Sequence, residues 1–252
     1  MTAPTPPPGR DLLQGKVVLV TAAAGTGIGN ATARRCLDEG ATVVISDAHE
    51  RRLQEAAEAL GTVAIPCDVT DESQVQAMID GTLREHGRLD VLINNAGLGG
   101  TAELVDMTDD QWDRVLDISL TGTMRCMRAA LRHMYGAGGG VIVNNASVMG
   151  WRAQAGQSHY AAAKAGVMAL TRCAAIEAAP HGVRINAVAP SLAMHAFLSK
   201  VTTDELLEEL TGREAFGRAA EPWEVATVIA FLASDYSTYM TGEVVSVSSQ
   251  RA

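Results

Sequence analysis

A serine, a tyrosine and a lysine in the middle of the chain have the types and spacing of a proton-transfer site. Tyr160 and Lys164 stand four residues apart, so on a helix their side chains project from one face. Ser147 precedes the tyrosine by thirteen residues and follows the apolar run 141–143, which is typical of a buried strand. Together a hydroxyl, a phenol and an ammonium could move a proton on and off an oxygen atom. The alternative is a tyrosine that only packs, beside a solvated lysine.

The elements that must position these residues alternate between strands and helices. Short β-branched runs predict strands, and segments with apolar residues at helical spacing follow most of them. The predicted strands cover residues 16–20, 41–46, 62–66, 90–93, 141–145, 184–188 and 243–247. Such alternation is typical of βαβ units. We therefore expect an α/β fold with a single doubly wound parallel sheet of about seven strands and helices on both faces.

The turn after the first predicted strand is rich in glycine. Residues 21–29 read Thr-Ala-Ala-Ala-Gly-Thr-Gly-Ile-Gly and lead into a predicted helix. A strand, a glycine-rich turn and a helix together place helix N-terminal amides around a phosphate group. The usual G-x-G-x-x-G spacing is not met, because Asn30 stands where the third glycine would fall. The turn predicts a dinucleotide site, with a purely structural turn as the alternative.

An aspartate closes the second predicted strand. Asp47 lies 18 positions after Gly29, where a carboxylate can accept hydrogen bonds from an adenosine ribose and would repel a 2′-phosphate. This favours NAD over NADP, although Arg51 and Arg52 follow within a turn and would soften the repulsion. A simple strand-end or helix-capping aspartate is the alternative interpretation.

Composition argues against several classes of protein. The chain has 252 residues, enough for one large domain, and 47% of them are hydrophobic. The 29 acidic residues exceed the 20 basic ones, which argues against a nucleic-acid or membrane partner. No apolar run reaches the length of a membrane span. We expect residues 1–11 to be a flexible, proline-rich tail without the apolar core of a signal peptide, and 12–252 to be one domain.

The cysteines and histidines show no metal-binding pattern. Cys36, Cys67, Cys126 and Cys173 lie far apart, with no CxxC pair and no His/Cys cluster. We therefore expect no metal site, and reduced cysteines in a cytoplasmic protein.

Taken together, these residues resemble the short-chain dehydrogenase/reductase family over nearly the whole chain, from about residue 12 to 248. The shared landmarks are the turn ending Gly27-Ile28-Gly29, Asp68-Val69, Asn94-Asn95-Ala96-Gly97, Ser147 thirteen residues before Tyr160, Tyr160-x-x-x-Lys164, and Asn186-Ala187-Val188-Ala189-Pro190. Each landmark is weak alone, but their order and spacing together are specific. The resemblance implies a Rossmann-like fold, a nicotinamide cofactor and a homotetramer or homodimer.

The resemblance also implies roles for individual residues. Tyr160 corresponds to the general acid/base, Lys164 to the residue that holds the nicotinamide ribose and lowers the tyrosine pKa, and Ser147 to the donor to the substrate oxygen. A positive charge roughly 5 Å from a phenol, at an effective dielectric of about 20, would lower the phenol pKa by some two units. The implied cofactor-binding residues are Thr21, Ala23, Gly25, Thr26, Gly27, Ile28, Asp47, Asp68, Val69, Asn95, Ala96, Gly97, Tyr160, Lys164 and Pro190.

Three departures from the family pattern mark this chain. The glycine turn has one extra residue, so Ala22 or Ala23 stands where the first glycine is expected. Ser119 occupies the position where many members carry the asparagine of a proton relay, which makes it a candidate fourth catalytic residue with a shorter reach. Ser191 replaces a glycine, and His195 falls where a threonine that contacts nicotinamide is common.

The segment 191–217 breaks the regular alternation, and we expect it to be a lid over the substrate. An ordinary surface excursion is the alternative. The candidate substrate-binding residues are Met149, Trp151, Leu192, Met194, His195 and Phe197. Most of these side chains are apolar, which suggests a bulky apolar substrate such as a steroid-like compound or a hydroxyacyl thioester.

We therefore predict an NAD-dependent oxidoreductase that transfers hydride between the cofactor and a secondary alcohol or ketone. An NADPH-dependent 3-oxoacyl reductase is the alternative enzyme, which Asp47 disfavours. A cofactor-binding regulatory protein on the same fold is the alternative from another class. Such a protein would be expected to have lost Ser147, Tyr160 or Lys164, and this chain keeps all three.

Overall fold

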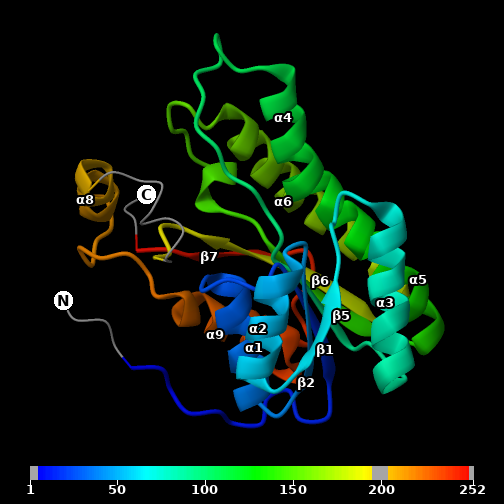
Figure 1. Cartoon of the computed structure of the whole chain (residues 1–252). Helices are drawn as coiled ribbons and strands as arrows, with labels where there is room; N and C mark the ends of the chain where they lie inside the picture. Colours follow the sequence, from blue (N-terminus) through cyan, green and yellow to red (C-terminus); the bar gives the residue numbers. More distant parts are fainter. Residues whose placement is uncertain (1–4, 195–203, 250–252) are drawn as a thin grey trace.

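One parallel sheet of seven strands, in the order β3-β2-β1-β4-β5-β6-β7, forms the centre of the molecule (Figure 1). The computed structural model describes residues 5–194 and 204–249. The strands are β1 (Val17–Thr21), β2 (Thr42–Asp47), β3 (Val63–Pro66), β4 (Val91–Asn94), β5 (Gly140–Asn145), β6 (Val183–Pro190) and β7 (Val244–Val247). The predicted α/β fold with one doubly wound parallel sheet is confirmed.

Helices cover both faces of this sheet. The helices are α1 (Ile28–Asp38), α2 (Glu50–Leu60), α3 (Glu72–His86), α4 (Asp109–Leu116), α5 (Gly122–Ala137), α6 (Ser158–Ala178), α8 (Asp204–Gly212) and α9 (Pro222–Ala233). Side chains of β1 alternate between the two faces: Val18 and Val20 belong to the core under α1, α2 and α9, whereas Leu19 belongs to the core under α3, α5 and α6. Each face is therefore sealed by its own apolar layer.

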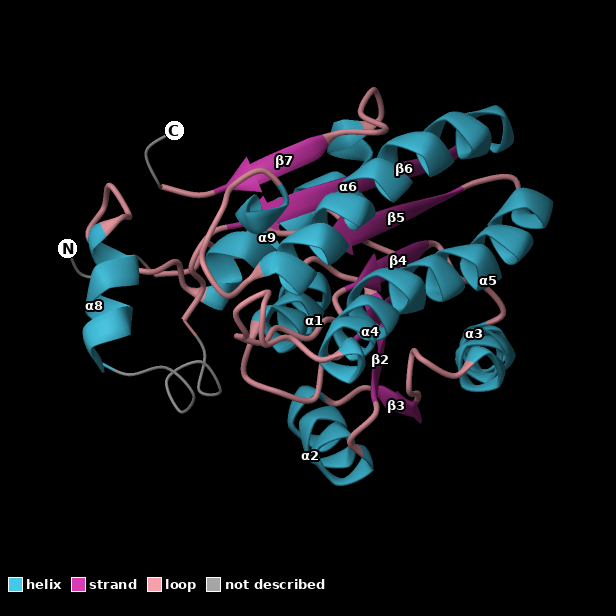
Figure 2. Cartoon of the chain, turned by 90° about the horizontal axis from the view of Figure 1, so that it is seen from above, coloured by secondary structure: helices cyan, strands magenta, loops and turns pink. Residues whose placement is uncertain are grey.

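The strand order changes direction beside β1. The chain runs outward from β1 to β2 and β3, then returns to place β4 on the other side of β1. In open α/β sheets, ligands bind at the carboxyl ends of the strands where the order reverses. Figure 2 shows the strand arrowheads pointing toward the side of the molecule on which α8 lies. The ends of β1 and β4 thus mark the edge at which a ligand site is expected.

The pattern Thr108-x-x-Gln111 predicts a capping box at the start of a long helix, and in the structure this helix has an interruption. The capping box itself is present, with Thr108 and Gln111 exchanging hydrogen bonds. Between α4 and α5, however, residues Asp117–Thr121 form a π-helical turn. Such turns widen a helix locally and are frequent at functional sites. Here the turn contains Ser119, the residue at the predicted relay position.

Part of the predicted flexible tail is hydrogen-bonded to α1. The buried Glu39 carboxylate accepts the backbone N–H groups of Arg10 and Leu12, and Arg35 donates to the carbonyl of Pro7 and to Glu39. Residues 7 and 10 of the predicted tail thus have hydrogen-bond partners at the end of α1. The buried Arg35–Glu39 ion pair supplies these partners. In the described parts of the chain, no helix is long and apolar enough to cross a membrane.

Candidate active site

The predicted catalytic trio converges at the carboxyl edge of the sheet. Ser147 lies just after β5, where its Oγ accepts the N–H of Met149 (3.2 Å) and donates to the carbonyl of Pro190 at the end of β6 (3.5 Å). Tyr160 and Lys164 lie one helical turn apart on α6, with Lys164 Nζ 5.6 Å from the centre of the tyrosine ring. Ser147 also hydrogen-bonds to Tyr160. A strand end and a helix face have therefore brought the three groups together.

The electrostatics of the trio differ from the sequence expectation. Burial raises the pKa of Tyr160 above its ordinary value of 10.0, and the hydrogen bond to Ser147 only partly opposes this. Burial also lowers the pKa of Lys164 to about 8. The expected lowering of the tyrosine pKa by Lys164 is not found, because loss of hydration is the largest cause of the pKa shift in both groups. Burial therefore favours the neutral form of each group.

An amide network connects Lys164 to the glycine turn. Lys164 Nζ donates to the backbone carbonyl of Asn145 (2.7 Å), and the Asn145 side chain donates to Asn95 Oδ1 (2.9 Å). Asn95 Nδ2 in turn donates to the carbonyls of Thr21 and Ala22. Because those two backbone carbonyls can only accept, the NH₂ group of the Asn95 side chain must face them, and its Oδ1 must face Asn145. The NH₂ group of Asn145 then donates to Asn95, and Asn145 Oδ1 is left buried without a partner.

Sequence reasoning missed Asn145. The available signal was its position two residues before Ser147, because residues two apart along an extended strand share a face. Asn144, by contrast, points to the other face, where it bonds to Asn94 and Thr171.

The glycine turn has the features of a phosphate cradle. Helix α1 begins at Gly27 without a side-chain cap, whereas α2, α3 and α4 are capped by His49, Asp71 and Thr108. Uncapped helix N-terminal amides are free to bind an anion. A side chain at Gly29 would collide with the carbonyl of Ala22 and the amide of Asn95, so only glycine fits. These observations fit the pyrophosphate of a dinucleotide.

The extra residue in this turn has a structural consequence. Ala22, one of the two alanines at which the first glycine of the family pattern is expected, adopts a left-handed backbone conformation with φ of 52°. The turn thus keeps the conformation that a glycine would favour, at some cost in strain. Among the other predicted turn residues, Thr21 and Ala23 are buried. Gly25 and Thr26 are exposed, and Gly27 and Ile28 are half-buried.

Two acidic residues lie where the adenosine half is expected. Asp47, at the end of β2, accepts the N–H groups of Ala24 (3.2 Å) and His49 (2.9 Å). Asp68 and Val69 follow β3, and Asp68 borders a pocket of about 820 Å³ that also reaches Ile118. The structure brings these residues to the same edge of the sheet as the trio.

Ser119 is buried beside the trio. Its hydroxyl accepts the N–H of Leu98 (2.9 Å) and donates to the Leu98 carbonyl (3.1 Å). The predicted cofactor residues Asn95, Ala96 and Gly97 directly precede Leu98. The hydroxyl that was expected to serve a relay is thus already engaged with the backbone.

The beginning of the predicted lid, residues 191–194, is hydrogen-bonded to the segment that precedes α9. The N–H of Met194 donates to the carbonyl of Ala220, and the N–H of Ala220 donates to the carbonyl of Leu192. Met149 is half-buried beside Ser147, and Trp151 is 52% exposed. His195 and Phe197, also predicted to contact substrate, lie outside the described residues.

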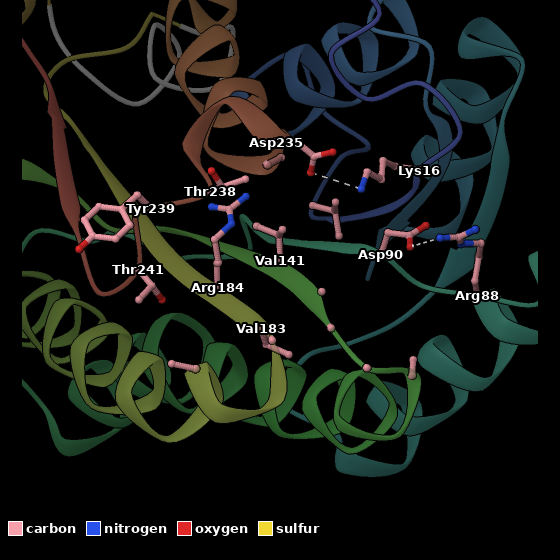
Figure 3. A pocket seen from close by; sticks show the side chains of 18 residues that line it. Lys16, Arg88, Asp90, Val141, Val183, Arg184, Asp235, Thr238, Tyr239 and Thr241 are labelled. Carbon is pink, nitrogen blue, oxygen red and sulfur yellow. Dashed lines mark hydrogen bonds and ion pairs between the residues drawn. The ribbon is translucent and has the colours of Figure 1, made fainter.

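The opposite edge of the sheet carries another pocket (Figure 3). It measures about 810 Å³ and is lined by Lys16, Arg88, Arg184 and Tyr239 among others. None of the predicted site residues lines it. Within the described residues, no cluster of His, Cys, Asp or Glu side chains could hold a metal ion.

Comparison with known proteins adds independent findings. A family model described as Enoyl-(Acyl carrier protein) reductase matches residues 22–249. A (5R,7aS)-5-hydroxy-7a-methyl-1-oxo-2,3,5,6,7,7a-hexahydro-1H-indene-carboxyl-CoA reductase from Mycobacterium tuberculosis is 67% identical, over 98% of this chain and 97% of its own length. A cis-4-hydroxycyclohexanecarboxylate dehydrogenase from Sinomonas cyclohexanicum is 44% identical, over 92% and 94%.

Further relatives include a reductase and a solved structure. A 3-oxoacyl-[acyl-carrier-protein] reductase from Thermotoga maritima is 39% identical, over 93% of this chain and 97% of its own length. The crystal structure of a short chain dehydrogenase from Mycobacterium smegmatis is 63% identical, covers 100% of this chain and 99% of its own, and has a TM-score of 0.89.

Proposed function

Because this chain belongs to the short-chain dehydrogenase/reductase family of NAD(P)-dependent oxidoreductases, we propose that it transfers hydride between NAD and a ring alcohol or ring ketone of a bulky alicyclic acyl thioester. The observation that carries the proposal is the convergence of Ser147, Tyr160 and Lys164 beside the glycine turn. The chain is an oxidoreductase of secondary alcohols or ketones. The cofactor form and the substrate class are the proposed refinements.

The residues of the trio divide the proton chemistry between them. In the oxidation direction, Ser147 Oγ donates a hydrogen bond to the substrate oxygen while Tyr160 takes the hydroxyl proton. Bound nicotinamide supplies the acceptor for the hydride. Burial opposes the tyrosine anion, so a nearby positive charge is needed for Tyr160 to lose its own proton. Lys164, with a pKa of about 8, is mostly charged near neutral pH and lies 5.6 Å from the centre of the tyrosine ring, so it supplies that positive charge.

The substrate proposal is supported by the names of two relatives and by the site. The Mycobacterium tuberculosis reductase acts on a bicyclic hydroxy-oxo carboxyl-CoA, and the Sinomonas cyclohexanicum dehydrogenase acts on a hydroxycyclohexanecarboxylate. Both compounds carry a hydroxyl group on a ring, together with a carboxyl group that is free in one and joined to CoA in the other. Met149, whose N–H donates to Ser147, and Trp151 supply apolar surface for such a ring system, and Leu192 and Met194 of the proposed lid, residues 191–217, add to it.

Asp47 supports NAD over NADP. Its carboxylate is held at the end of β2 by the N–H groups of Ala24 and His49, where it would repel a ribose 2′-phosphate. Arg51, which was expected to soften this repulsion, pairs with Glu55 at 2.7 Å. That pair leaves less of the arginine charge available to a phosphate.

Two alternatives remain distinct from this proposal. The 3-oxoacyl-[acyl-carrier-protein] reductase from Thermotoga maritima, 39% identical, supports an NADPH-dependent 3-oxoacyl reductase as the runner-up. A regulatory protein that binds cofactor without turnover is disfavoured, because all three catalytic groups are present. Ser147 hydrogen-bonds to Tyr160, and Lys164 lies beside the tyrosine ring on α6.

We also propose a homodimer or homotetramer in the cytoplasm. β7 lies at an end of the strand order, and the segment leading into it exposes Tyr236 and Tyr239. Unpaired sheet edges and exposed aromatic side chains favour association with a second copy. The four cysteines are all free, which supports a reducing compartment. Light scattering tests the assembly, and a monomer would contradict it.

Initial rates with a matched substrate series test the function. The series comprises 4-hydroxycyclohexanecarboxyl-CoA, its free acid and a linear 3-hydroxyacyl-CoA of equal carbon number, each with NAD and with NADP. We expect the highest kcat/KM for the alicyclic thioester with NAD. Preference for the linear thioester with NADP would support the 3-oxoacyl reductase, and tight NAD binding without any turnover would support the regulatory protein.

A further inference from the structure

Glu214, between α8 and α9, is a buried carboxylate that pairs with no cation of the described residues. It is 4% exposed, and none of the ion pairs within residues 5–194 and 204–249 includes it. Glu39 is the other buried glutamate of this part of the chain, and it pairs with Arg35. Burying a charge without an opposite charge destabilises a fold, so hydrogen bonds have to satisfy the carboxylate of Glu214.

Two hydrogen bonds satisfy this carboxylate, and they come from segments far apart in the sequence. The hydroxyl of Ser249, just after β7, donates to Oε2 (2.8 Å). The N–H of Leu192, just after β6, donates to Oε1 (3.4 Å). The segment that carries Glu214 passes beside the end of β7 (Figure 1), where the N–H of Ala215 donates to the carbonyl of Ser249 (2.7 Å). One side chain thus joins the ends of two strands to the stretch before α9.

These bonds reinforce the two ends of the predicted lid. We call residues 191–194 and 214–220 the lid stems, and their backbones are hydrogen-bonded to each other. Leu192 lies in the first stem and Glu214 in the second, so the carboxylate adds a side-chain bond to this backbone pairing. Ser249 ties the paired stems to the chain that follows β7.

The first stem begins beside the catalytic serine. Ser147 Oγ donates to the carbonyl of Pro190 (3.5 Å), and Leu192 follows two residues later. Two residues of extended chain span at most about 7 Å, so Leu192 lies within that distance of the residue that Ser147 contacts. Leu192 is half-buried and is one of the predicted substrate contacts. Its position depends on Glu214 as well as on β6.

We propose that Glu214 is a positioning residue for the substrate: its carboxylate holds Leu192 in place beside Ser147 by tying the lid stems to the chain after β7. The role rests on the proposed hydride-transfer function, and it makes Glu214 a determinant of which ring system the site accepts. An apolar side chain of the same size would fill this position without burying a charge. The advantage of a carboxylate here is therefore the pair of bonds that it accepts.

Two variants of Glu214 separate positioning from stability. Glu214→Met keeps most of the volume and removes both bonds. We expect KM for 4-hydroxycyclohexanecarboxyl-CoA to rise about fivefold or more, kcat to stay within about twofold, and the preference over the linear 3-hydroxyacyl-CoA to fall. The free energy of unfolding should stay the same or rise, because a buried charge is removed. In Glu214→Gln the amide offers an acceptor to Leu192 and a donor to Ser249, and we expect the wild-type KM to return.

A partner variant and a control complete the series. Ser249→Ala removes one of the two bonds, and we expect a smaller rise in KM. Adding Ser249→Ala to Glu214→Met should raise KM no further, because both changes act through the same carboxylate. Glu39→Gln is the matched control, since Glu39 is also a buried carboxylate that accepts backbone N–H groups, and it should leave KM unchanged.

The hold on Leu192 can be followed without turnover. Hydrogen exchange of the Leu192 amide, measured by NMR on the protein without cofactor or substrate, reports how firmly its N–H is bonded. We expect this exchange to be about fivefold faster or more in Glu214→Met. Glu214→Gln and Glu39→Gln should match the wild type.

Each result supports or overturns the proposal. A higher KM and faster Leu192 exchange in Glu214→Met, with wild-type behaviour in Glu214→Gln and Glu39→Gln, supports it. An unchanged KM in folded Glu214→Met, or a rise of the same size in Glu214→Gln, would overturn it. If Glu214→Met does not fold, an unchanged KM in Ser249→Ala has the same meaning. Absence of turnover in the wild type would refute the proposed function, and the exchange rates alone would then decide whether Glu214 holds Leu192.

Discussion

The carboxyl and amino edges of the sheet both carry pockets, of about 820 and 810 Å³. The edges differ in the polar groups beside the catalytic trio, which line neither pocket. At the amino edge, Lys16 pairs with Asp235 and Arg88 pairs with Asp90 (Figure 3). Arg184 donates to oxygens of residues 232, 234, 237 and 240. No lining residue of this pocket, all of them in the described part of the chain, has a buried polar atom without a partner.

The carboxyl edge retains unsatisfied groups. Asn94 Oδ1, Asn145 Oδ1 and His159 Nδ1 are buried without partners, and burial lowers the pKa of Lys164 to about 8. Such groups cost stability, and they cluster where a protein binds ligands or transfers protons. The comparison teaches that pocket volume does not distinguish the two edges. Displaced pKa values do not either, because burial also lowers the pKa of Arg184 at the amino edge. The unmet hydrogen bonding beside the trio is what sets the carboxyl edge apart.

The largest expected effect is on turnover at the carboxyl edge. Tyr160→Phe removes the proton acceptor, and we expect kcat to fall by about 10³-fold or more, because general acid–base groups contribute roughly 10²- to 10⁴-fold. NADH binding, followed by fluorescence, should stay close to wild type. Tyr239→Phe, at the amino-edge pocket, is the matched control and should keep full activity. Comparable turnover in the two variants would contradict the assignment.

The next effect is on stability at the amino edge. Arg184→Met removes four donated hydrogen bonds at about 1 kcal/mol each, so we expect the free energy of unfolding to fall by about 4 kcal/mol. Urea unfolding measures this loss, while kcat should remain unchanged. Arg88→Met, which breaks an exposed pair with Asp90, should lose less than about 1 kcal/mol. A large loss of kcat in folded Arg184→Met would contradict the assignment of turnover to the carboxyl edge alone.

The pH dependence of stability gives a third test. Lys164 has a pKa of about 8 in the folded protein against 10.5 ordinarily, so between these values the unfolded chain binds more protons. The contribution of Lys164 to the free energy of unfolding should therefore rise by about 3 kcal/mol as pH increases from 8 to 10.5. Below pH 8 the full cost of the buried charge is present.

Comparison with a variant isolates this term. Buried thiols act in the opposite direction, because burial raises the pKa of Cys36 and Cys67 to about 12. The measured quantity is thus the difference in unfolding free energy between wild type and Lys164→Met across this pH range. A difference that does not vary with pH would show that Lys164 is hydrated.

The smallest effect concerns the strained turn of the carboxyl edge. Ala22→Gly relieves a left-handed alanine, φ 52°, and we expect a gain of up to about 1 kcal/mol in the free energy of unfolding. Ala24→Gly, where no positive φ occurs, should instead lose up to about 1 kcal/mol. Equal losses in both variants would mean that Ala22 carries no strain.

Local patterns explain why much of this protein could be predicted. The alternation of β-branched runs and helical spacing is a property of neighbouring residues, so it predicted the parallel sheet. The Thr108 capping box follows in the same way from two residues three positions apart. The same holds for the trio, because a spacing of four on α6 and a strand end before Ser147 are readable in one dimension. The family resemblance then assigned their chemistry.

Contacts between distant segments decided the rest. The amide chain from Lys164 through Asn145 and Asn95 joins three strand ends, and the bonds of Ser119 to Leu98 cross 21 residues. The direction of the Tyr160 and Lys164 pKa shifts also depends on burial, which the spacing of the two residues does not specify. The sequence by itself therefore determined which chemical groups meet at this edge. Only the tertiary structure decided how much water they keep and which backbone groups hold them, because hydration and hydrogen-bond partners are set by packing across the fold.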